Sequence, residues 1–405
     1  MSEPTRPATR RRILYLDPYT VRIGRRPGPG SPPSSDAIGY AITSSATIRT
    51  GLADLGWEVI QPQIDLPEED DGHVRRLRWL LRSYEGALEV LGSSPPEVIF
   101  IFHAFSVFPT EIRRMILDLR LKVPLVGYTH GSHWDPTDTF RFEVYPGMEV
   151  ADLANLCVLD RVFLVSHQIH KTLQTTIAKF NPAVAKMLDT RYEVVGLPLD
   201  VGLIEASRTE ARDPRPMIVF NHAPVASKDP EMFVRVMRRI LPRYDVQVLF
   251  TRRFLPEHAG GEAVAALAAD FSEQVILGNN LPLPDYYSAL WRAELQVSTA
   301  THESLGVSTL EAMYAGCCCV LPRVGSYPEI TGNHPDVHYD RGDDQLEERL
   351  TYFLDHPDRR RAVAADLQQA AARYRPEVVV RRIADVLESV CSLHEAPFGL
   401  ARHPH

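Results

Sequence analysis

The sequence of 405 residues lacks any apolar run of the roughly 18–20 residues that a membrane-spanning helix requires. It contains only five cysteines, too few for a disulfide framework in a chain of this length. Its net charge is −8, so it also lacks the basic balance of a dedicated nucleic-acid-binding protein. These absences argue against a membrane-spanning protein, a disulfide-rich secreted domain and a nucleic-acid coat protein.

Signals for export, zinc and dinucleotide binding are missing as well. The arginine-rich N-terminus has no apolar signal core, so no export signal is visible. Three of the cysteines, Cys317–Cys319, are consecutive in an apolar run, which suits a buried strand better than a zinc site. The glycine-rich loop after the first predicted strand has no GxGxxG pattern. We therefore expect a protein of the reducing cytoplasm.

The residues that are present, 44% hydrophobic and 24% charged, are typical of a soluble globular protein long enough for two domains. Short apolar runs alternate with amphipathic segments in two successive series, one in each half of the chain. This pattern predicts an α/β protein with two Rossmann-like, doubly wound domains. Ligands of such sheets bind beyond the carboxyl ends of the strands, so both domains are expected to face a central cleft that holds the site.

The predicted boundaries follow the pattern of these segments. Residues 1–12 form a basic disordered tail, residues 13–205 the first Rossmann-like domain and residues 206–375 the second. Residues 376–391 form a final amphipathic helix.

One stretch, residues 299–322, combines strand, loop and helix signals with two glutamates. A polar turn with Glu303 precedes Gly306, a helix of about nine residues follows, and the apolar run Cys317–Leu321 comes next. A helix N-terminus has free N–H groups and a partial positive charge, which attract a phosphate. Glu303 before the helix and Glu311 inside it could accept hydrogen bonds from sugar hydroxyls. The alternative is a solvated loop carboxylate and an ordinary helix stabiliser.

This glutamate pair resembles the signature of the retaining glycosyltransferases of the GT-B fold that use nucleotide sugars. The signature is a glutamate, seven residues and a second glutamate, here Glu303-SLGVSTL-Glu311 followed by AMYAG. The residues Asp285-Tyr286-Tyr287 before it and Pro328-Glu329-Ile330 after it also fit, so the similarity covers most of residues 217–330.

Within that group, the second half is most similar to the tRNA-queuosine mannosyltransferases, whereas the first half resembles them much less. The similarity is carried by Asn221-His222, Lys228-Asp229-Pro230-Glu231, Ser298-Thr299-Ala300, His302-Glu303, Gly306-Val307, Leu310-Glu311-Ala312, Tyr314 and Gly316-Cys317.

The resemblance implies a role for each matching position. Glu303, His130 and Lys228 are the implied catalytic residues: the first two face the donor sugar, and the lysine neutralises the departing diphosphate. Glu311 holds the ribose hydroxyls, and Asn221 belongs to the same donor site. The backbone N–H groups that meet the sugar and the diphosphate are those of Leu305, Gly306, Val307 and Ser308. Because Lys228 and the helix end would compensate the negative charge of the diphosphate, a metal is not expected. No resident cofactor is expected either.

The chain departs from the family pattern at Ala223, where an arginine usually precedes the lysine by five residues. We expect Arg252 or Arg253, at the end of the next predicted strand, to supply the missing positive charge. The alternative is that both are surface arginines. Leu305 is a milder departure, since an aromatic residue is frequent there.

The first domain is expected to select the acceptor. His103, His133 and Arg22 are the candidate acceptor-binding residues, and Gly24 could approach the diphosphate from the loop after the first strand. Histidines at strand ends are also often hydrogen-bonded structural groups. His133 and Asp135, with the histidine at 130, do not indicate a metal site because a third well-placed ligand is missing.

Arginines gather in two places early in the chain, separated by the acidic run Asp65–Asp71. They are Arg22, Arg25, Arg26, Arg75, Arg76, Arg78 and Arg82. They could form a basic face for an RNA acceptor, or simply a solvated loop and helix face.

The sequence therefore predicts a metal-independent, retaining hexosyltransferase that moves a sugar from a nucleotide-diphosphate sugar to an acceptor hydroxyl. The favoured acceptor is a small molecule such as a natural product, and a tRNA with a queuosine-like base is the alternative. A nucleotide-sugar epimerase and a catalytically silent nucleotide-sugar-binding protein remain open as functions of other classes. The final helix is expected to cross back to the first domain, as the family's fold implies. The sequence does not indicate the oligomeric state.

Overall fold

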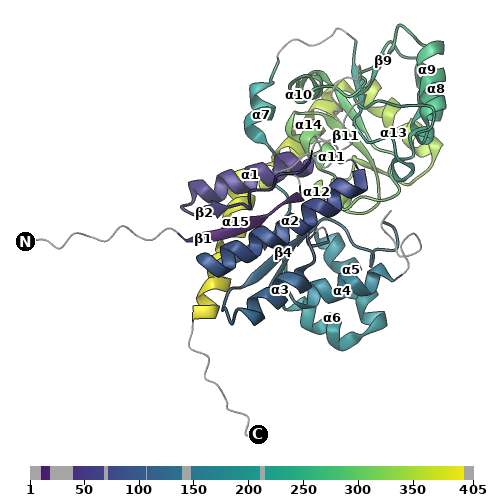
Figure 1. Cartoon of the computed structure of the whole chain (residues 1–405). Helices are drawn as coiled ribbons and strands as arrows, with labels where there is room; N and C mark the ends of the chain where they lie inside the picture. The colour runs from purple at the N-terminus through teal and green to yellow at the C-terminus, as the bar shows by residue number, and fades with distance from the viewer. Residues whose placement is uncertain are drawn as a thin grey trace, which may run out of the picture.

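The computed structural model of the protein describes residues 11–18, 40–67, 72–105, 107–138, 147–209 and 215–395. Within these ranges the chain forms two halves, each with a six-stranded parallel sheet covered by helices (Figure 1). The predicted pair of doubly wound, Rossmann-like units is confirmed. Arg22 and Gly24 lie outside the described residues, as do Arg25, Arg26 and most of the predicted basic tail.

The first sheet has the order β2-β1-β3-β4-β5-β6, with parallel neighbours throughout. Its strands are β1 (Arg12–Leu16), β2 (Glu58–Ile60), β3 (Val98–Ile101), β4 (Leu125–Thr129), β5 (Arg161–Leu164) and β6 (Tyr192–Val194). β3 and β4 are buried throughout because helices cover both faces, which explains their continuous apolar runs. The strand order reverses between β1 and β3, so ligands are expected beyond the carboxyl ends of these two strands.

The helices of the first half are α1 (Tyr40–Asp54), α2 (Gly72–Ser93), α3 (Pro109–Asp118), α4 (Met148–Cys157), α5 (His167–Phe180), α6 (Pro182–Asp189) and α7 (Val201–Ala206). Of these, α4, α6 and α7 were not predicted. α7 packs against the second half, where Trp291 Nε1 donates to the carbonyl of Ile204 at 2.8 Å.

The second sheet has the order β12-β11-β10-β7-β8-β9 and is also parallel. Its strands are β7 (Met217–Phe220), β8 (Gln247–Phe250), β9 (Val275–Leu277), β10 (Leu295–Val297), β11 (Cys318–Pro322) and β12 (His338–Tyr339). The order reverses between β7 and β10, which marks the carboxyl ends of these strands as the place for a ligand. Cys317–Cys319 are fully buried at and within β11, as predicted for core residues.

The helices of the second half are α8 (Pro230–Ile240), α9 (Gly261–Asp270), α10 (Leu283–Arg292), α11 (Val307–Tyr314), α12 (Tyr327–Ile330), α13 (Asp343–Asp355) and α14 (Pro357–Ala371), with the 3-10 turns η3 (Ala226–Lys228) and η4 (Ala372–Tyr374). α9 was not predicted, because its alanine-rich sequence has little amphipathic contrast.

The last helix, α15 (Pro376–Glu395), packs against α1 of the first half (Figure 1). The two helices approach closely at Gly51, where a Cβ atom would lie 2.9 Å from Cγ1 of Val380. A glycine is therefore needed at this crossing unless the valine shifts.

Candidate active site

The turn that joins β10 to α11 is built around Gly306. This residue has φ +85°, and a Cβ atom there would lie 3.1 Å from Cε1 of Tyr327. Side chains other than hydrogen are therefore strained at this position. α11 begins at Val307, and its N-cap residue, Gly306, has no side chain to cap the first N–H groups. The turn thus presents the N-terminus of α11 and its partial positive charge, which suits a phosphate.

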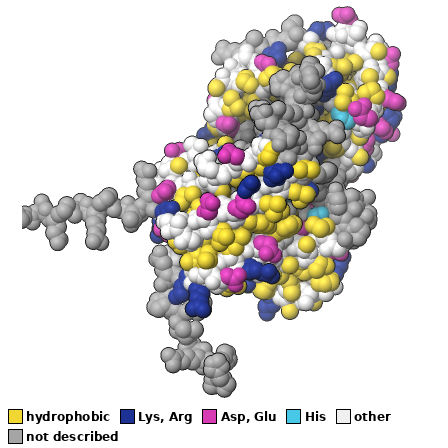
Figure 2. Space-filling model, viewed as in Figure 1, with side chains coloured by type: hydrophobic (Ala, Val, Ile, Leu, Met, Phe, Trp, Pro, Cys, Tyr) yellow, Lys and Arg dark blue, Asp and Glu magenta, His cyan; other side chains and the backbone are white. Residues whose placement is uncertain are grey.

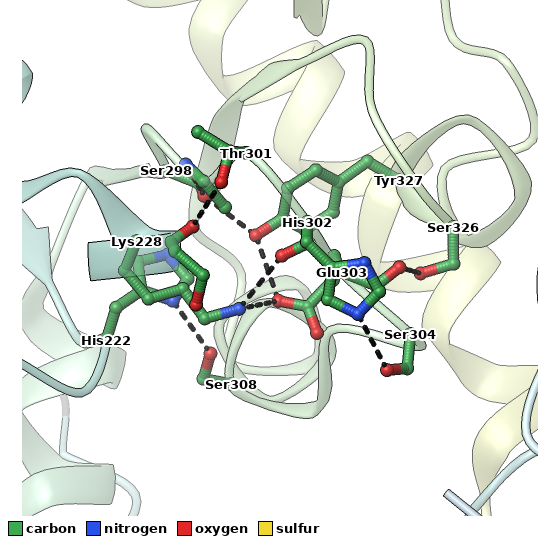
Figure 3. A network of polar contacts seen from close by, with 12 residues as sticks. His222, Lys228, Ser298, Thr301, His302, Glu303, Ser304, Ser308, Ser326 and Tyr327 are labelled. Carbon is green, nitrogen blue, oxygen red and sulfur yellow. Dashed lines mark hydrogen bonds and ion pairs between the residues drawn. The ribbon is translucent and has the colours of Figure 1, made fainter. Parts of the chain in front are cut away.

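Glu303 in this turn is paired with Lys228 of η3 (Figure 3). The Lys228 Nζ atom lies 2.8 Å from Glu303 Oε2 and also donates to the carbonyl of His302 at 3.2 Å. The hydroxyl of Tyr327 donates to the same carboxylate oxygen at 3.3 Å. The Lys228 and Glu303 side chains are only 17% and 13% exposed, so most of the pair is shielded from water.

The protonation state of Glu303 follows from this pairing. Burial, the largest single influence, would raise its pKa. The charge and hydrogen bond of Lys228, together with the neighbouring His222 and His302, hold the pKa below the usual value. The carboxylate is therefore ionised at neutral pH. A diphosphate at the end of α11 would compete with it for the lysine.

Glu311 lies one turn inside α11 and is held by two tyrosines of α10. The Tyr286 hydroxyl donates to Glu311 Oε2 at 2.7 Å, and the Tyr287 hydroxyl donates to Oε1 at 3.0 Å. Burial raises the pKa of Glu311, and these two hydrogen bonds offset part of the increase. Glu311 is 7% exposed, so it is neither a surface carboxylate nor an ordinary helix stabiliser.

Polar side chains at the ends of β7 and β10 connect the two parts of the site. Asn221 donates to the Tyr286 hydroxyl at 3.1 Å and to the carbonyl of Ser308 at 2.8 Å. The ring of His222 lies 3.3 Å from the Ser308 hydroxyl (Figure 3). It also lies 3.1 Å from Nε2 of Gln296. Burial, followed by the charge of Lys228, lowers the pKa of His222 to about 3, so its imidazole is neutral.

The two arginines after β8 are placed differently. The Arg252 guanidinium lies 6.0 Å from the centre of the Tyr286 ring. Its charge opposes part of the rise in the pKa of Glu311 that burial causes. Arg253 is exposed, and its backbone N–H donates to Asn280. Of the two, only Arg252 is brought to the residues around Glu311.

In the first half, His103 and His130 follow β3 and β4 and stack on each other. Their ring centres are 5.2 Å apart with an interplanar angle of 16°, and His130 Nε2 lies 3.0 Å from the carbonyl of Phe102. Burial lowers the pKa of His103 to about 4 and that of His130 to about 3. Both rings are neutral at physiological pH and can bind a ligand only as neutral groups.

The loop after β4 connects this region to the glutamate turn. Thr137 Oγ1 lies 2.8 Å from His302 Nδ1, and the carboxylates of Asp135 and Asp138 lie 3.8 and 3.7 Å from the same ring. His302 directly precedes Glu303, so the first half contacts the turn that carries the predicted catalytic glutamate.

A second contact joins α5 of the first half to the second half. The Ser166 hydroxyl donates to the carbonyl of Ser304 at 2.6 Å. The Glu329 carboxylate accepts from the backbone N–H groups of His167 at 3.0 Å and Gln168 at 3.1 Å, at the N-terminus of α5. A carboxylate is stabilised there by the helix dipole. Glu329 therefore caps a helix of the opposite half.

His133, predicted to bind the acceptor, is engaged within the first half. Its Nδ1 atom and its backbone N–H lie 2.7 and 3.0 Å from Asp152 Oδ2 of α4. The described residues contain no group of three or more His, Cys, Asp or Glu side chains that could hold a metal ion. Within the same ranges, no helix is both long and apolar enough to cross a membrane.

The structure pairs Lys228 with Glu303 in the turn that leads to Gly306 and α11. It also joins Asn221, Glu311 and Arg252 through contacts with Tyr286. Sequence reasoning did not select His222, Tyr286, Tyr287 or Tyr327 as site residues. The signal was available for the two α10 tyrosines, because Asp285-Tyr286-Tyr287 belongs to the resemblance. His222 belongs to the resemblance as well, through Asn221-His222. Tyr327 could not be found from spacing, since it reaches the turn only through the packing of a separate loop.

Two parallel doubly wound halves, with a phosphate-receptive helix end where the second sheet reverses its order, define the GT-B class of fold. Residues 205–370, most of the second half, match the family described as glycosyl transferases group 1.

Solved structures resemble the chain over nearly its whole length. The sucrose-phosphate synthase of Thermosynechococcus elongatus has a TM-score of 0.72 at 13% identity, covering 95% of this chain and 100% of that chain. A glycosyltransferase from Rickettsia africae has a TM-score of 0.66 at 10% identity, covering 94% and 99%. Anabaena HepE in complex with UDP has a TM-score of 0.60 at 15% identity, covering 93% and 100%. Identities this low establish a shared fold and no more.

Proposed function

We propose that the protein is a retaining glycosyltransferase that transfers a hexose-type sugar from a nucleotide-diphosphate sugar to an acceptor hydroxyl. The observation that carries this proposal is the Lys228–Glu303 pair beside the uncapped N-terminus of α11, within a glycosyltransferase group 1 domain. A cation, a helix end and an ionised carboxylate together suit a ligand with a diphosphate at one end and a sugar at the other.

The donor is expected to lie along the turn and α11. Its diphosphate accepts hydrogen bonds from the first N–H groups of α11 and from Lys228, with Arg252 as a further positive charge. Its ribose hydroxyls donate to Glu311, whose oxygens already accept from two tyrosines but keep further lone pairs. Its sugar hydroxyls donate to Glu303.

In the reaction, the bond between the anomeric carbon and the diphosphate oxygen breaks, and the acceptor oxygen bonds to that carbon on the same face. The acceptor proton passes to the departing diphosphate. Lys228 and the end of α11 stabilise the negative charge that develops on this group, so no metal is required for that purpose. Retention predicts a product with the anomeric configuration of the donor, which NMR of the isolated product measures directly.

The acceptor is expected to be a small molecule that enters from the first half, near His103 and His130. The net charge of −8 favours it over a polyanion, whereas a modified tRNA remains the alternative. A salt titration of acceptor binding separates the two, because binding to RNA weakens steeply with salt and binding of an uncharged small molecule does not.

A thermal-shift screen of nucleoside diphosphates and nucleotide sugars tests the central claim. A ligand that binds only the folded protein raises its Tm, and UDP is the first to test because the similar Anabaena structure contains it. If none of these ligands raises the Tm, the proposal is wrong. Conversion of a donor sugar without any acceptor would identify an epimerase, and binding without turnover would identify a silent binding protein.

A further inference from the structure

Helix α2 carries an exposed apolar stripe that nothing in the proposed reaction uses. Val74, Leu77, Leu81 and Leu88 are 52%, 56%, 62% and 48% exposed. Their spacing of three, four and seven residues places them on one side of the helix. The core-facing side is separate and includes the buried residues Trp79 and Ala87. Figure 2 shows hydrophobic side chains, with basic and acidic ones beside them, on the face that α2 crosses in Figure 1.

The charges beside the stripe are divided along the helix. Arg78 and Arg82 lie in its first half, and Glu85 and Glu89 lie in its second half. All four are exposed. Arg82 and Glu85 are 2.5 Å apart within one copy, but their side chains remain 52% and 60% exposed and can exchange partners.

This face of α2 is complementary to the same face of a second copy when the two helices run antiparallel. Leu77 of one copy then lies opposite Leu88 of the other, with the two Leu81 side chains near the centre. The same arrangement brings Arg78 and Arg82 opposite Glu85 and Glu89 of the second copy. A parallel arrangement would instead bring arginine against arginine.

We propose that α2 forms the centre of a two-fold symmetric homodimer, in which the leucine stripes pack together and the arginine and glutamate pairs set the antiparallel direction. A two-fold axis requires a surface complementary to itself, which this helix face is. An RNA phosphate backbone would leave the leucines without apolar contacts. An anionic membrane would repel Glu85 and Glu89 beside the stripe.

Light scattering coupled to gel filtration tests the dimer on the full chain. The expected mass is twice 45.6 kDa for the wild type, with dissociation on dilution. The double variant Arg78→Glu with Arg82→Glu places four glutamates against four glutamates and should be monomeric. Adding Glu85→Arg and Glu89→Arg restores opposite charges and should restore the dimer. Leu81→Ser with Leu88→Ser should be monomeric, with the Tm of the wild type at a dilution where it is monomeric, because both leucines are exposed in the monomer.

Recovery of the dimer in the four-site variant would show that the arginines and glutamates of the two copies pair directly, since a general effect of charge would not be reversed in this way. A monomeric wild type at every concentration, or a four-site variant that stays monomeric, would overturn the proposal. Binding of the wild type to phosphatidylglycerol vesicles or to tRNA would also overturn the proposal if the double variant Arg78→Glu with Arg82→Glu no longer bound them. The helix would then serve a different partner. None of these outcomes depends on glycosyl transfer.

Discussion

The Lys228 ammonium lies 2.8 Å from the Glu303 carboxylate, at the turn between β10 and α11, and each side chain is less than one-fifth exposed. The proposed function assigns the lysine to the diphosphate of a donor and the glutamate to its sugar. The two residues come from separate loops, 75 positions apart, so the site is assembled by the second sheet.

Replacing Lys228 by alanine is expected to remove most activity and some stability. Loss of one group that stabilises the departing charge typically lowers kcat by about 10²–10³-fold. Breaking a buried pair also leaves Glu303 without its cation, which costs on the order of 3–5 kcal/mol before relaxation. Single-turnover kinetics and urea unfolding measure the two effects. The double variant with Glu303→Ala should recover much of the stability but none of the activity. A double variant as unstable as Lys228→Ala would contradict the pairing.

Glu311 should govern nucleoside diphosphate affinity, with its tyrosines acting through it. Glu311→Ala is expected to weaken binding measured by calorimetry by more than about tenfold, since hydrogen bonds to charged groups contribute roughly 1.5–3 kcal/mol. Tyr286→Phe and Tyr287→Phe should each have a smaller effect. Tyr244→Phe removes a hydroxyl bonded to the exposed Asp355, away from Glu311, and serves as the matched control. Equal affinities for all four variants would exclude Glu311 from the donor site.

Arg252, rather than Arg253, should compensate for Ala223. Arg252→Ala is expected to weaken binding of a nucleoside diphosphate about tenfold or more, because a charge-assisted contact to phosphate is lost. Arg253→Ala is the neighbouring control and should leave affinity unchanged. Ala223→Arg should strengthen binding and partly rescue Arg252→Ala. Full affinity in the Arg252→Ala variant would show that another group binds the phosphates.

Stability should decline below neutral pH because several histidines are buried in the neutral form. The pKa values of His130 and His222 are lowered to about 3, and those of His103 and His338 to about 4, chiefly by burial. In the unfolded chain these histidines have the ordinary pKa near 6.5, so between the folded and unfolded pKa values the unfolded state binds more protons. As the pH falls through this range, the free energy of unfolding therefore decreases by up to about 1.4 kcal/mol per histidine for each pH unit. Urea unfolding at several pH values between 4 and 7 measures the slope.

His222→Asn should reduce that slope by the share of one histidine. His338, which is bonded to Thr331, offers a second variant, His338→Gln, with the same expected reduction. A slope that neither variant changes would mean that these two side chains do not titrate as inferred.

Glu329 should couple the two halves. Glu329→Ala removes the acceptor for two N–H groups of α5, so the contact between the halves weakens and KM for the donor should rise more than kcat falls. Glu348→Ala, on an exposed face of α13, is the matched control. Small-angle scattering should show a larger radius of gyration for the first variant only. An unchanged radius and KM would show that the contact has no such role.

Much of this protein could be predicted from local patterns. The two halves, most of the long helices and the turn with Glu303 and Glu311 followed from hydrophobic periodicity and glycine positions, since these act within a few residues of the chain. The short helices α4, α6, α7 and α9 were missed, although α3, α10 and α11 of similar length were predicted. For α9 the reason is an alanine-rich sequence with little amphipathic contrast. All the catalytic, donor-binding and acceptor-binding roles assigned from the sequence stay predictions, those of Glu303, Lys228 and His130 included. Arg22 and Gly24 lie outside the described residues.

The sequence by itself determined the phosphate-receptive turn, because a glycine at positive φ and a following helix are local properties of the backbone. Only the tertiary structure decided which side chains surround it. It paired Lys228 with Glu303, set two tyrosines of α10 on Glu311, brought Arg252 but not Arg253 toward that glutamate, and joined Glu329 to the opposite half. These contacts depend on strand order, which places the ends of distant strands side by side and leaves no signature in spacing along the chain.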